Sequence, residues 1–288
     1  MELKDLEIFQ TVAEKGTITE AAKALNYVQS NITSRIQRLE EELKTPLFHR
    51  HRRGMRLTPE GKKLLTYSEK LLSLAEEMKK VVQDNGEPAG KLEIGTVETV
   101  FHLPQILSSY INRYKHVDVT LVTGVTEELE DEVLHFRLDG AFVSEADFHP
   151  EIETYDVFQE ELVLISNQHR SLDELLEQPF LCFSKGCIYR ARLEAWYTDQ
   201  NVTPKLMEFG TLETIVRSVV AGLGISFVPR SSVAPFIENG LIYCHSLPEA
   251  YSKIKTVFIR RKDSYLTSTM EKLIETIAQH RKIWIENE

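Results

Sequence analysis

The chain has 288 residues, of which 42% are hydrophobic, 9% aromatic and 27% charged, and this composition excludes collagen-like and wholly disordered chains. No stretch approaches the roughly 20 apolar residues that a membrane helix needs, because the longest, 219–228, is interrupted by Gly and Ser. The acidic N-terminus does not resemble a secretory leader, and three scattered cysteines suit a reducing compartment. We therefore expect a cytoplasmic protein of about two domains with no membrane partner.

Charge divides the chain into two unlike parts, although the net charge is -10. Residues 1–86 carry 15 Lys and Arg against 13 Asp and Glu, whereas residues 87–288 carry 19 against 31. Within residues 44–63, seven basic side chains accompany the single acid Glu60. A basic N-terminal patch joined to an acidic body is typical of a DNA-binding module attached to a sensing or assembly module.

The first 43 residues predict three helices with a tight turn between the second and the third. Apolar residues at helical spacing run from Leu3 to Ala13, and Gly16 supplies a C-terminal cap. Thr17 and Glu20 stand in the relation of a capping box, which opens a short helix ending at about residue 25. A third helix begins at residue 29 or 30 and buries an apolar stripe, which consists of Ile32, Ile36, Leu39 and Leu43.

The opposite face of the third helix carries hydroxyl, amide and arginine side chains, which can match base edges and phosphates in a major groove. The predicted DNA contacts on this face are Gln29, Ser30, Asn31, Thr33, Ser34, Arg35 and Arg38. Residues 47–57 place a cationic loop between apolar anchors, which is the form of a β-wing over phosphates or a minor groove. The predicted contacts of this wing are Arg50, Arg52 and Arg53. For the helix alone, the alternative is the solvated face of a generic three-helix bundle.

This region contains several short motifs. They are Ala21-Ala22 with Leu25, Val28-Gln29-Ser30, the run from Ser34 to Leu43, Pro46-Leu47-Phe48 with Arg50, and Leu57-Thr58-Pro59-Glu60-Gly61. Together they resemble the N-terminal winged helix-turn-helix of LysR-type transcriptional regulators, nearly unbroken for about sixty residues. The resemblance implies that the third helix enters the major groove of double-stranded DNA and that Arg50 approaches the neighbouring minor groove or backbone. Lys44 departs from the family, which usually has Gly there, and this puts the local turn in question.

A long helix is predicted from residue 59, because Thr58 is a good N-cap and Pro59 suits the first helical position. Its apolar residues alternate in spacing between three and four, as in a coiled-coil seam. This predicted dimerisation seam consists of Leu64, Tyr67, Leu71, Leu74, Met78 and Val81. The alternative is that the helix packs against the chain's own body. In LysR relatives this helix pairs with its copy, so the resemblance implies a homodimer or a dimer of dimers on an inverted-repeat operator.

Gly and Pro between residues 84 and 90 mark the predicted boundary between a DNA-binding domain (1–58) with its linker helix (59–86) and a regulatory domain (90–288). Beyond it, strands are predicted at 91–96, 118–123, 140–143, 162–165, 180–183, 206–209, 224–228, 241–244 and 256–260. Helices are predicted at 103–114, 127–138, after Ser171, around Trp196, from Thr211 and at 268–284. This order indicates an α/β fold following an N-terminal all-α winged helix-turn-helix. The resemblance implies a two-lobed effector domain like that of periplasmic binding proteins, with lobe I at about 90–161 and 266–288 and lobe II at about 162–265.

Ligands of open α/β sheets bind beyond the carboxyl ends of the strands, where helix N-termini present free amides. The residues selected by this rule are Thr96, Glu98, Thr99, Val100, Ser144, Ser184, Gly186 and Thr211. Any single hydroxyl among them could equally be a helix cap, so only their convergence favours a pocket. The resemblance implies that the turn at Thr99 and Val100 faces the ligand. Amides of Val100 and Leu212 would favour an anion, whereas Glu98 and the acidic body oppose one, so we expect a small polar metabolite of at most one negative charge.

A rival interpretation is a two-lobed α/β enzyme, or a thiol redox sensor, with a helical N-terminal appendage. Cys182 and Cys187 would form its redox pair, as in the peroxide-sensing branch of the LysR family, whereas the plainer account is two buried, inert thiols. The sequence shows no nucleophile elbow, catalytic triad or metal-ligand spacing. We therefore predict a DNA-binding transcriptional regulator controlled by a small effector between two lobes, with no enzyme activity, cofactor or metal.

Overall fold

The computed structural model describes residues 1–51 and 54–287, so the predicted wing residues Arg52 and Arg53 lie outside the described part of the chain. The chain divides into two compact units, Met1–Gln83 with His135–Arg137, and Asp84–Leu134 with Leu138–Glu288. None of the helices in the described ranges has the length and apolar character that crossing a bilayer requires.

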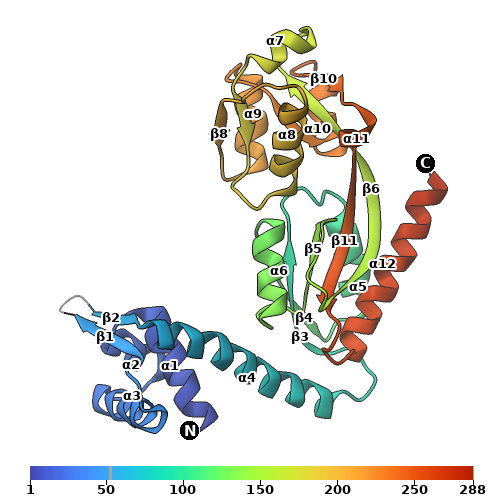
Figure 1. Cartoon of the computed structure of the whole chain (residues 1–288). Helices are drawn as coiled ribbons and strands as arrows, with labels where there is room; N and C mark the ends of the chain where they lie inside the picture. The colour runs from blue at the N-terminus through green and yellow to red at the C-terminus, as the bar shows by residue number, and fades with distance from the viewer. Residues whose placement is uncertain (52–53, 288) are drawn as a thin grey trace. The chain divides into compact units, whose positions relative to one another are not determined.

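The first unit is a helical bundle with a two-stranded wing (Figure 1). Its elements are α1 (Leu3–Lys15), α2 (Ile18–Leu25), α3 (Gln29–Leu43), β1 (Phe48–His51), β2 (Gly54–Leu57) and α4 (Pro59–Gln83). These are the elements that the spacing of apolar residues predicts, and the antiparallel pair β1–β2 forms at the predicted wing. The bundle core contains Ile8, Phe9 and Val12 of α1, Ala21 and Ala22 of α2, and Ile32, Ile36 and Leu39 of α3. Leu43, the last residue of the predicted stripe, is exposed.

The ends of the three short helices show how local residues fix the bundle. Gly16 ends α1 in the left-handed conformation with a φ of 71°. The Thr17 hydroxyl accepts a hydrogen bond from the backbone N–H of Glu20, but the Glu20 carboxylate pairs with Lys23, so only half of the predicted capping box forms. Lys44 ends α3 with a φ of 54°, also left-handed, so a lysine here takes a conformation that Gly adopts more easily.

The second unit contains nine strands and eight helices in its described residues. The strands are β3 (Gly90–Thr96), β4 (Val117–Thr123), β5 (Gly140–Ser144), β6 (Ile152–Ser166), β7 (Phe180–Cys182), β8 (Leu206–Glu208), β9 (Ser226–Pro229), β10 (Tyr243–Ser246) and β11 (Lys253–Arg261). The helices are α5 (Leu103–Arg113), α6 (Thr126–Leu134), α7 (Leu172–Leu176), α8 (Ile188–Asp199), α9 (Leu212–Val220), α10 (Arg230–Glu238), α11 (Glu249–Ser252) and α12 (Ser268–Asn287).

Lobe I is a sheet with helices on both faces. Strands β5, β3 and β4 run parallel in that order, and β11 joins β5 antiparallel. In Figure 1, α5 and α12 lie on one side of this sheet and α6 on the other. Successive side chains along the strands point to opposite faces of the sheet and so enter two cores. Phe142 and Phe258 enter the core beneath α5 and α12, whereas Val143 and Val257 enter the core beneath α6.

Lobe II is joined to lobe I by the long strand β6. The first half of β6 pairs with β11, and its second half, from Leu162 onward, pairs with β9 and β10. A separate parallel pair, β7 and β8, stands beside α8 and α9 (Figure 1). The fully buried Trp196 of α8 packs against Phe227 of β9, which centres one of the two cores of this lobe.

Among the elements that differ from the sequence-based expectation, three have a clear local cause. Strand β6 begins ten residues earlier than predicted, at Ile152, because its first half alternates buried and charged residues that do not look like a buried strand. Helix α6 ends at Leu134, since Phe136 takes a φ of 60° that no helix continues. The unpredicted helix α10 contains Pro235, a residue that sequence rules treat as a helix breaker.

Candidate DNA interface and effector pocket

The polar face of α3 begins at the helix N-terminus and is largely open to solvent. Gln29, Ser30 and Ser34 are exposed, and Asn31 and Thr33 are half-buried. The Thr33 hydroxyl donates to the backbone carbonyl of Gln29, so it braces the first turn of the helix. The first turn carries no acidic residue that would repel phosphate. This face therefore presents hydroxyl and amide groups without a competing negative charge.

Arg35 and Arg38 are held by α1, which sequence reasoning did not anticipate. The guanidinium of Arg35 donates to Asp5 at 2.7 Å, and that of Arg38 donates to the same carboxylate at 2.8 Å. Asp5 is 1% exposed. Burial opposes ionisation of this carboxyl, but the hydrogen bonds from Arg38, from the backbone of Glu2 and from Arg35 outweigh it and lower its pKa. The two arginines thus anchor α3 to α1, and their guanidinium groups are partly occupied.

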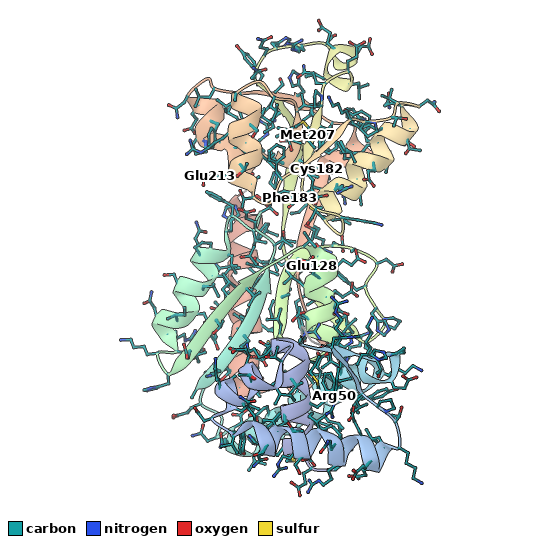
Figure 2. The ribbon with its side chains drawn as sticks, turned by 90° about the vertical axis from the view of Figure 1, so that its left-hand side faces the viewer. Arg50, Glu128, Cys182, Phe183, Met207 and Glu213 are labelled. Carbon is teal, nitrogen blue, oxygen red and sulfur yellow. The ribbon has the colours of Figure 1, made fainter. Side chains whose placement is uncertain are left out.

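The wing is attached to the bundle at two points. The backbone N–H of Met55 donates to the carbonyl of Gly16 at 2.7 Å. Gly54 lies against the same carbonyl so closely that a Cβ at this position would collide with it. The Glu40 carboxylate accepts the backbone N–H groups of Leu47 and Phe48. Arg50 of β1, labelled in Figure 2, is half-exposed and its guanidinium lies 3.6 Å from Glu40. The wing is therefore positioned by hydrogen bonds to its backbone, and the exposed Arg50 side chain is paired with Glu40.

The predicted dimerisation seam on α4 is exposed over most of its length. Tyr67, Leu71, Leu74 and Met78 have exposed fractions between 43% and 67%, and Val81 is half-buried. Leu64, at the start of the seam, packs instead against the core of the helical bundle. A row of exposed apolar side chains at coiled-coil spacing favours a partner helix over solvent.

A cavity of about 200 Å³ lies between the two lobes of the second unit. Four predicted residues line it, which are Glu98, Thr99, Ser144 and Ser184. The other four do not: Thr96 is buried with its hydroxyl on the Val97 carbonyl, Val100 belongs to the lobe I core, Gly186 lies against Glu127, and Thr211 caps α9 beside the lining residue Gly210. The sequence rule thus selected four residues that line this cavity and four that do not.

Residues that sequence reasoning missed come from both lobes. The main ones are Thr126 and Glu128 at the start of α6, Phe183 after β7, and Cys187, Ile188 and Tyr189 at the start of α8. Figure 2 labels Glu128 on the lobe I side and Phe183 on the lobe II side. The signal for Thr126 and Glu128 was available, since they follow the carboxyl end of β4. Tyr189 carried none, because an aromatic residue in an amphipathic helix is usually a core residue.

Tyr189 connects the two lobes within the pocket. Its hydroxyl lies 2.6 Å from the hydroxyl of Thr99, and it is also hydrogen-bonded to Ser144. Burial raises the pKa of Tyr189 well above its ordinary value, although the hydrogen bonds with Thr99 and Ser144 act in the opposite direction. The group is therefore a neutral hydroxyl that joins α8 of lobe II to the strand ends of lobe I.

The free helix amides expected at the pocket are occupied. The backbone N–H of Leu212, at the start of α9, donates to the Glu98 carboxylate at 2.8 Å. The N–H of Val100 donates to the Val97 carbonyl. The α9 terminus is therefore already taken by a carboxylate of the chain itself, the group that was expected to oppose an anion.

The thiols of Cys182 and Cys187 in lobe II have a raised pKa, whereas reactive cysteines have a lowered one. Burial raises the pKa of the Cys182 thiol to about 11 and also raises that of Cys187. A raised pKa keeps a thiol protonated and slow to react, which argues against the redox-pair interpretation. Among the described residues, no three or more His, Cys, Asp and Glu side chains gather in a way that could hold a metal ion.

Comparison with known proteins accounts for both units. Residues 3–62 match the model of the bacterial regulatory helix-turn-helix protein, lysR family, and residues 85–282 match that of the LysR substrate binding domain. The chain is 56% identical over 279 residues to the HTH-type transcriptional regulator SoxR of Arthrobacter sp. (strain TE1826), covering 96% of each chain. It is 50% identical over 285 residues to the HTH-type transcriptional regulator CzcR of Bacillus subtilis (strain 168), covering 98% of this chain and 99% of the relative.

The fold is also that of solved relatives. The crystal structure of full-length CbnR complexed with the target DNA has a TM-score of 0.70 and 22% identity to this chain, and the match covers 97% of this chain and 100% of CbnR. These matches cover both the winged helix-turn-helix and the two-lobed α/β unit. The chain belongs to the LysR family of DNA-binding transcriptional regulators with an effector-binding domain.

Proposed function

We propose that this regulator reads an inverted-repeat operator in the cytoplasm with α3 and the wing, dimerises through α4, and responds to a small effector in the cavity between its lobes. Gln29, Ser30, Asn31, Thr33 and Ser34 contact or flank bases, and Arg50 with Arg52 and Arg53 contacts phosphates or the minor groove. The regulation needs no catalytic step, since an effector that favours one lobe arrangement shifts its population.

One observation carries the effector proposal. A cavity large enough for a small metabolite has hydrogen-bonding groups of both lobes on its walls, and Thr99 of lobe I is bonded there to Tyr189 of lobe II. A ligand that competes for these hydroxyl groups changes the free energy of the contact between the lobes. An interaction worth about 1–3 kcal/mol is enough to couple the two sites of an allosteric protein.

Thr99→Val tests the proposal, because it removes the hydroxyl with almost no change of volume. Small polar metabolites are screened by thermal shift against the full-length chain, and each one that stabilises it is then titrated against wild type and variant. We expect the variant to lose most of the stabilisation and the ligand-dependent change in DNA binding, and to remain able to bind DNA without ligand.

The matched control is Thr154→Val, the same substitution at an exposed position of β6. It should respond to ligand as the wild type does. Equal responses of Thr99→Val and wild type would remove Thr99 from the site. Loss of basal DNA binding in Thr99→Val would show that this residue serves the fold.

A further inference from the structure

The charged side chains on the wall of the effector cavity are both acidic. Glu98 follows β3 and Glu128 lies in the first turn of α6, and every other lining residue is uncharged. The wall therefore has two carboxylates and no basic group within the described residues. A negatively charged ligand would have to enter against both carboxylates, whereas a positively charged one would be attracted by them.

The basic side chains that follow lining residues in the sequence do not themselves line the cavity. Arg190, one residue after Tyr189, pairs with Glu194 at 2.9 Å and with Glu208 at 2.8 Å. Lys185, one residue after Ser184, is exposed and lines a second hollow along α6, which shares Glu128 with the effector cavity. Neither basic side chain lines the effector cavity itself.

Two of the helix N-termini beside the cavity are capped by the same two carboxylates. Glu98 accepts the Leu212 N–H at the start of α9, and Glu128 lies 3.5 Å from the Val125 N–H at the start of α6. A third helix, α8, begins at the lining residue Ile188, and its N-cap residue Cys187 makes no side-chain cap hydrogen bond. Each helix terminus contributes about half a positive charge, so the three offset about one and a half of the two negative charges. The cavity therefore keeps a small negative balance.

The hydroxyl of Thr126 supplies an independent sign of a ligand. Thr126 lines the cavity, is 5% exposed, and its side-chain oxygen has no hydrogen-bond partner among the described residues. An unpaired buried hydroxyl is costly, and native structures nearly always satisfy such groups. A ligand in the cavity would satisfy this one. Thr126 and Glu128 both lie at the start of α6, so a hydrogen-bonding group and a charge are presented together.

We propose that the effector carries an ammonium group, held by Glu98 and Glu128, together with a hydroxyl or carbonyl oxygen that bonds to Thr126. This inference rests on the proposed effector function of the cavity and narrows its ligand to small organic cations. The volume of about 200 Å³ suits a molecule of the size of an amino alcohol or a small amine.

Three probes of similar size and different charge test the proposal. They are ethanolamine, which is a cation with a hydroxyl, ethylene glycol, which is neutral, and glycolate, which is an anion. Binding to the full-length chain is measured by thermal shift and by calorimetry in the same buffer. We expect ethanolamine to stabilise the protein, ethylene glycol to do so more weakly, and glycolate to have no effect.

Glu128→Gln removes the charge and keeps the shape of the side chain. It should weaken ethanolamine binding by about tenfold while leaving ethylene glycol unchanged, because only the cation forms a charge-assisted hydrogen bond with this carboxylate. Thr126→Val should weaken both. The control is Glu213→Gln on α9, an exposed carboxylate that pairs with Arg217 and does not line the cavity. This variant should bind all three probes as the wild type does.

The outcomes separate this inference from the proposed function. Binding of glycolate, with no effect or a gain in Glu128→Gln, would overturn the cation assignment and leave the effector cavity in place. Failure of ethanolamine to bind at any concentration would overturn it as well. Metabolites that bind the wild type and do not bind Thr99→Val would then still establish the cavity as the effector site.

Discussion

At the scale of single residues, Asp5 has the largest structural role in the DNA-binding unit. It is buried in α1, it accepts hydrogen bonds from Arg35 and Arg38 of α3, and it receives the backbone N–H of Glu2. This carboxylate therefore helps to position α3 relative to α1, together with the apolar core that the two helices share. We infer that Arg35 and Arg38 position α3 in addition to any contact that they make with DNA.

Asp5→Asn should destabilise the protein near neutral pH by roughly 1–3 kcal/mol, because two guanidinium groups lose a charged partner. The lowered pKa of Asp5 means that its contribution is complete above the unfolded pKa of about 3.9 and is lost as the pH falls through the folded value. The difference between wild type and variant should thus shrink below about pH 4. Thermal unfolding across this range measures it, with the exposed Glu14→Gln as control. A difference independent of pH would show that Asp5 is not ionised in the fold.

Arg50→Ala and Asn31→Ala should impair DNA binding in different ways. Arg50→Ala removes the charge that we propose contacts the DNA backbone, so it should weaken binding to every duplex and lower the salt slope by about 0.9 for each phosphate that is no longer neutralised. Asn31→Ala should alter sequence preference at a cost of about 1–3 kcal/mol and leave the salt slope nearly unchanged. Both variants are titrated with a specific and a scrambled duplex at several salt concentrations. If Arg50→Ala leaves affinity and slope unchanged, the wing does not contact DNA.

Residue-level contacts were the hardest feature to predict. The sequence predicted that the polar residues between Gln29 and Ser34 form an open face. Helical spacing alone places them on the side of the helix away from Ile32 and Ile36. The sequence could not predict that Arg35 and Arg38 share Asp5, since 30 and 33 residues separate them and only the crossing of α1 and α3 brings them together. For the same reason, the sequence could not show that Glu98 accepts the backbone N–H of Leu212, 114 residues away.

At the scale of elements, α4 carries a row of exposed apolar side chains that its own chain does not cover. Tyr67, Leu71, Leu74 and Met78 repeat at coiled-coil spacing and stay exposed. Burying this row against a second copy removes apolar surface from water and places two DNA-binding units on one symmetric operator. The proposed seam therefore links a local pattern to the arrangement that reads DNA.

Leu71→Asp places an unpaired charge in the proposed seam, and it should dissociate the dimer or weaken it strongly. Light scattering over a range of concentrations gives the oligomeric state, and circular dichroism checks that the chain is folded. Lys70→Asp is the control, because its neighbouring position is exposed and lies outside the seam. Dimers of equal stability in both variants would show that α4 does not hold the copies together.

Elements were predicted well where one periodicity dominates. α1 to α5, β3 to β5 and α12 appear close to their expected positions because apolar spacing, caps and Gly or Pro boundaries agree there. The first half of β6 was missed because Glu153, Asp156 and Glu160 stand among its apolar residues. Pairing with β11, which sequence reasoning cannot see, makes this segment a strand.

At the scale of the whole chain, regulation requires that a change in the effector unit alters DNA binding. Within that unit, Tyr189 joins α8 of lobe II to Thr99 and Ser144 of lobe I, and Glu98 joins lobe I to the start of α9. These contacts define one arrangement of the lobes. If this arrangement is coupled to the operator, weakening the contacts changes DNA affinity even without an effector.

Operator affinity of Tyr189→Phe is the measurement that tests this account most directly. The operator is recovered by mapping bound DNA, and the full-length variant is titrated with it and with a scrambled duplex. Tyr197→Phe is the matched control, since it makes the same change on the same helix and its hydroxyl has no partner among the described residues. The account predicts that Tyr189→Phe alone changes operator affinity by about fivefold or more, with the scrambled duplex unaffected. Operator affinity equal to that of Tyr197→Phe and wild type would contradict the coupling of the lobes to DNA.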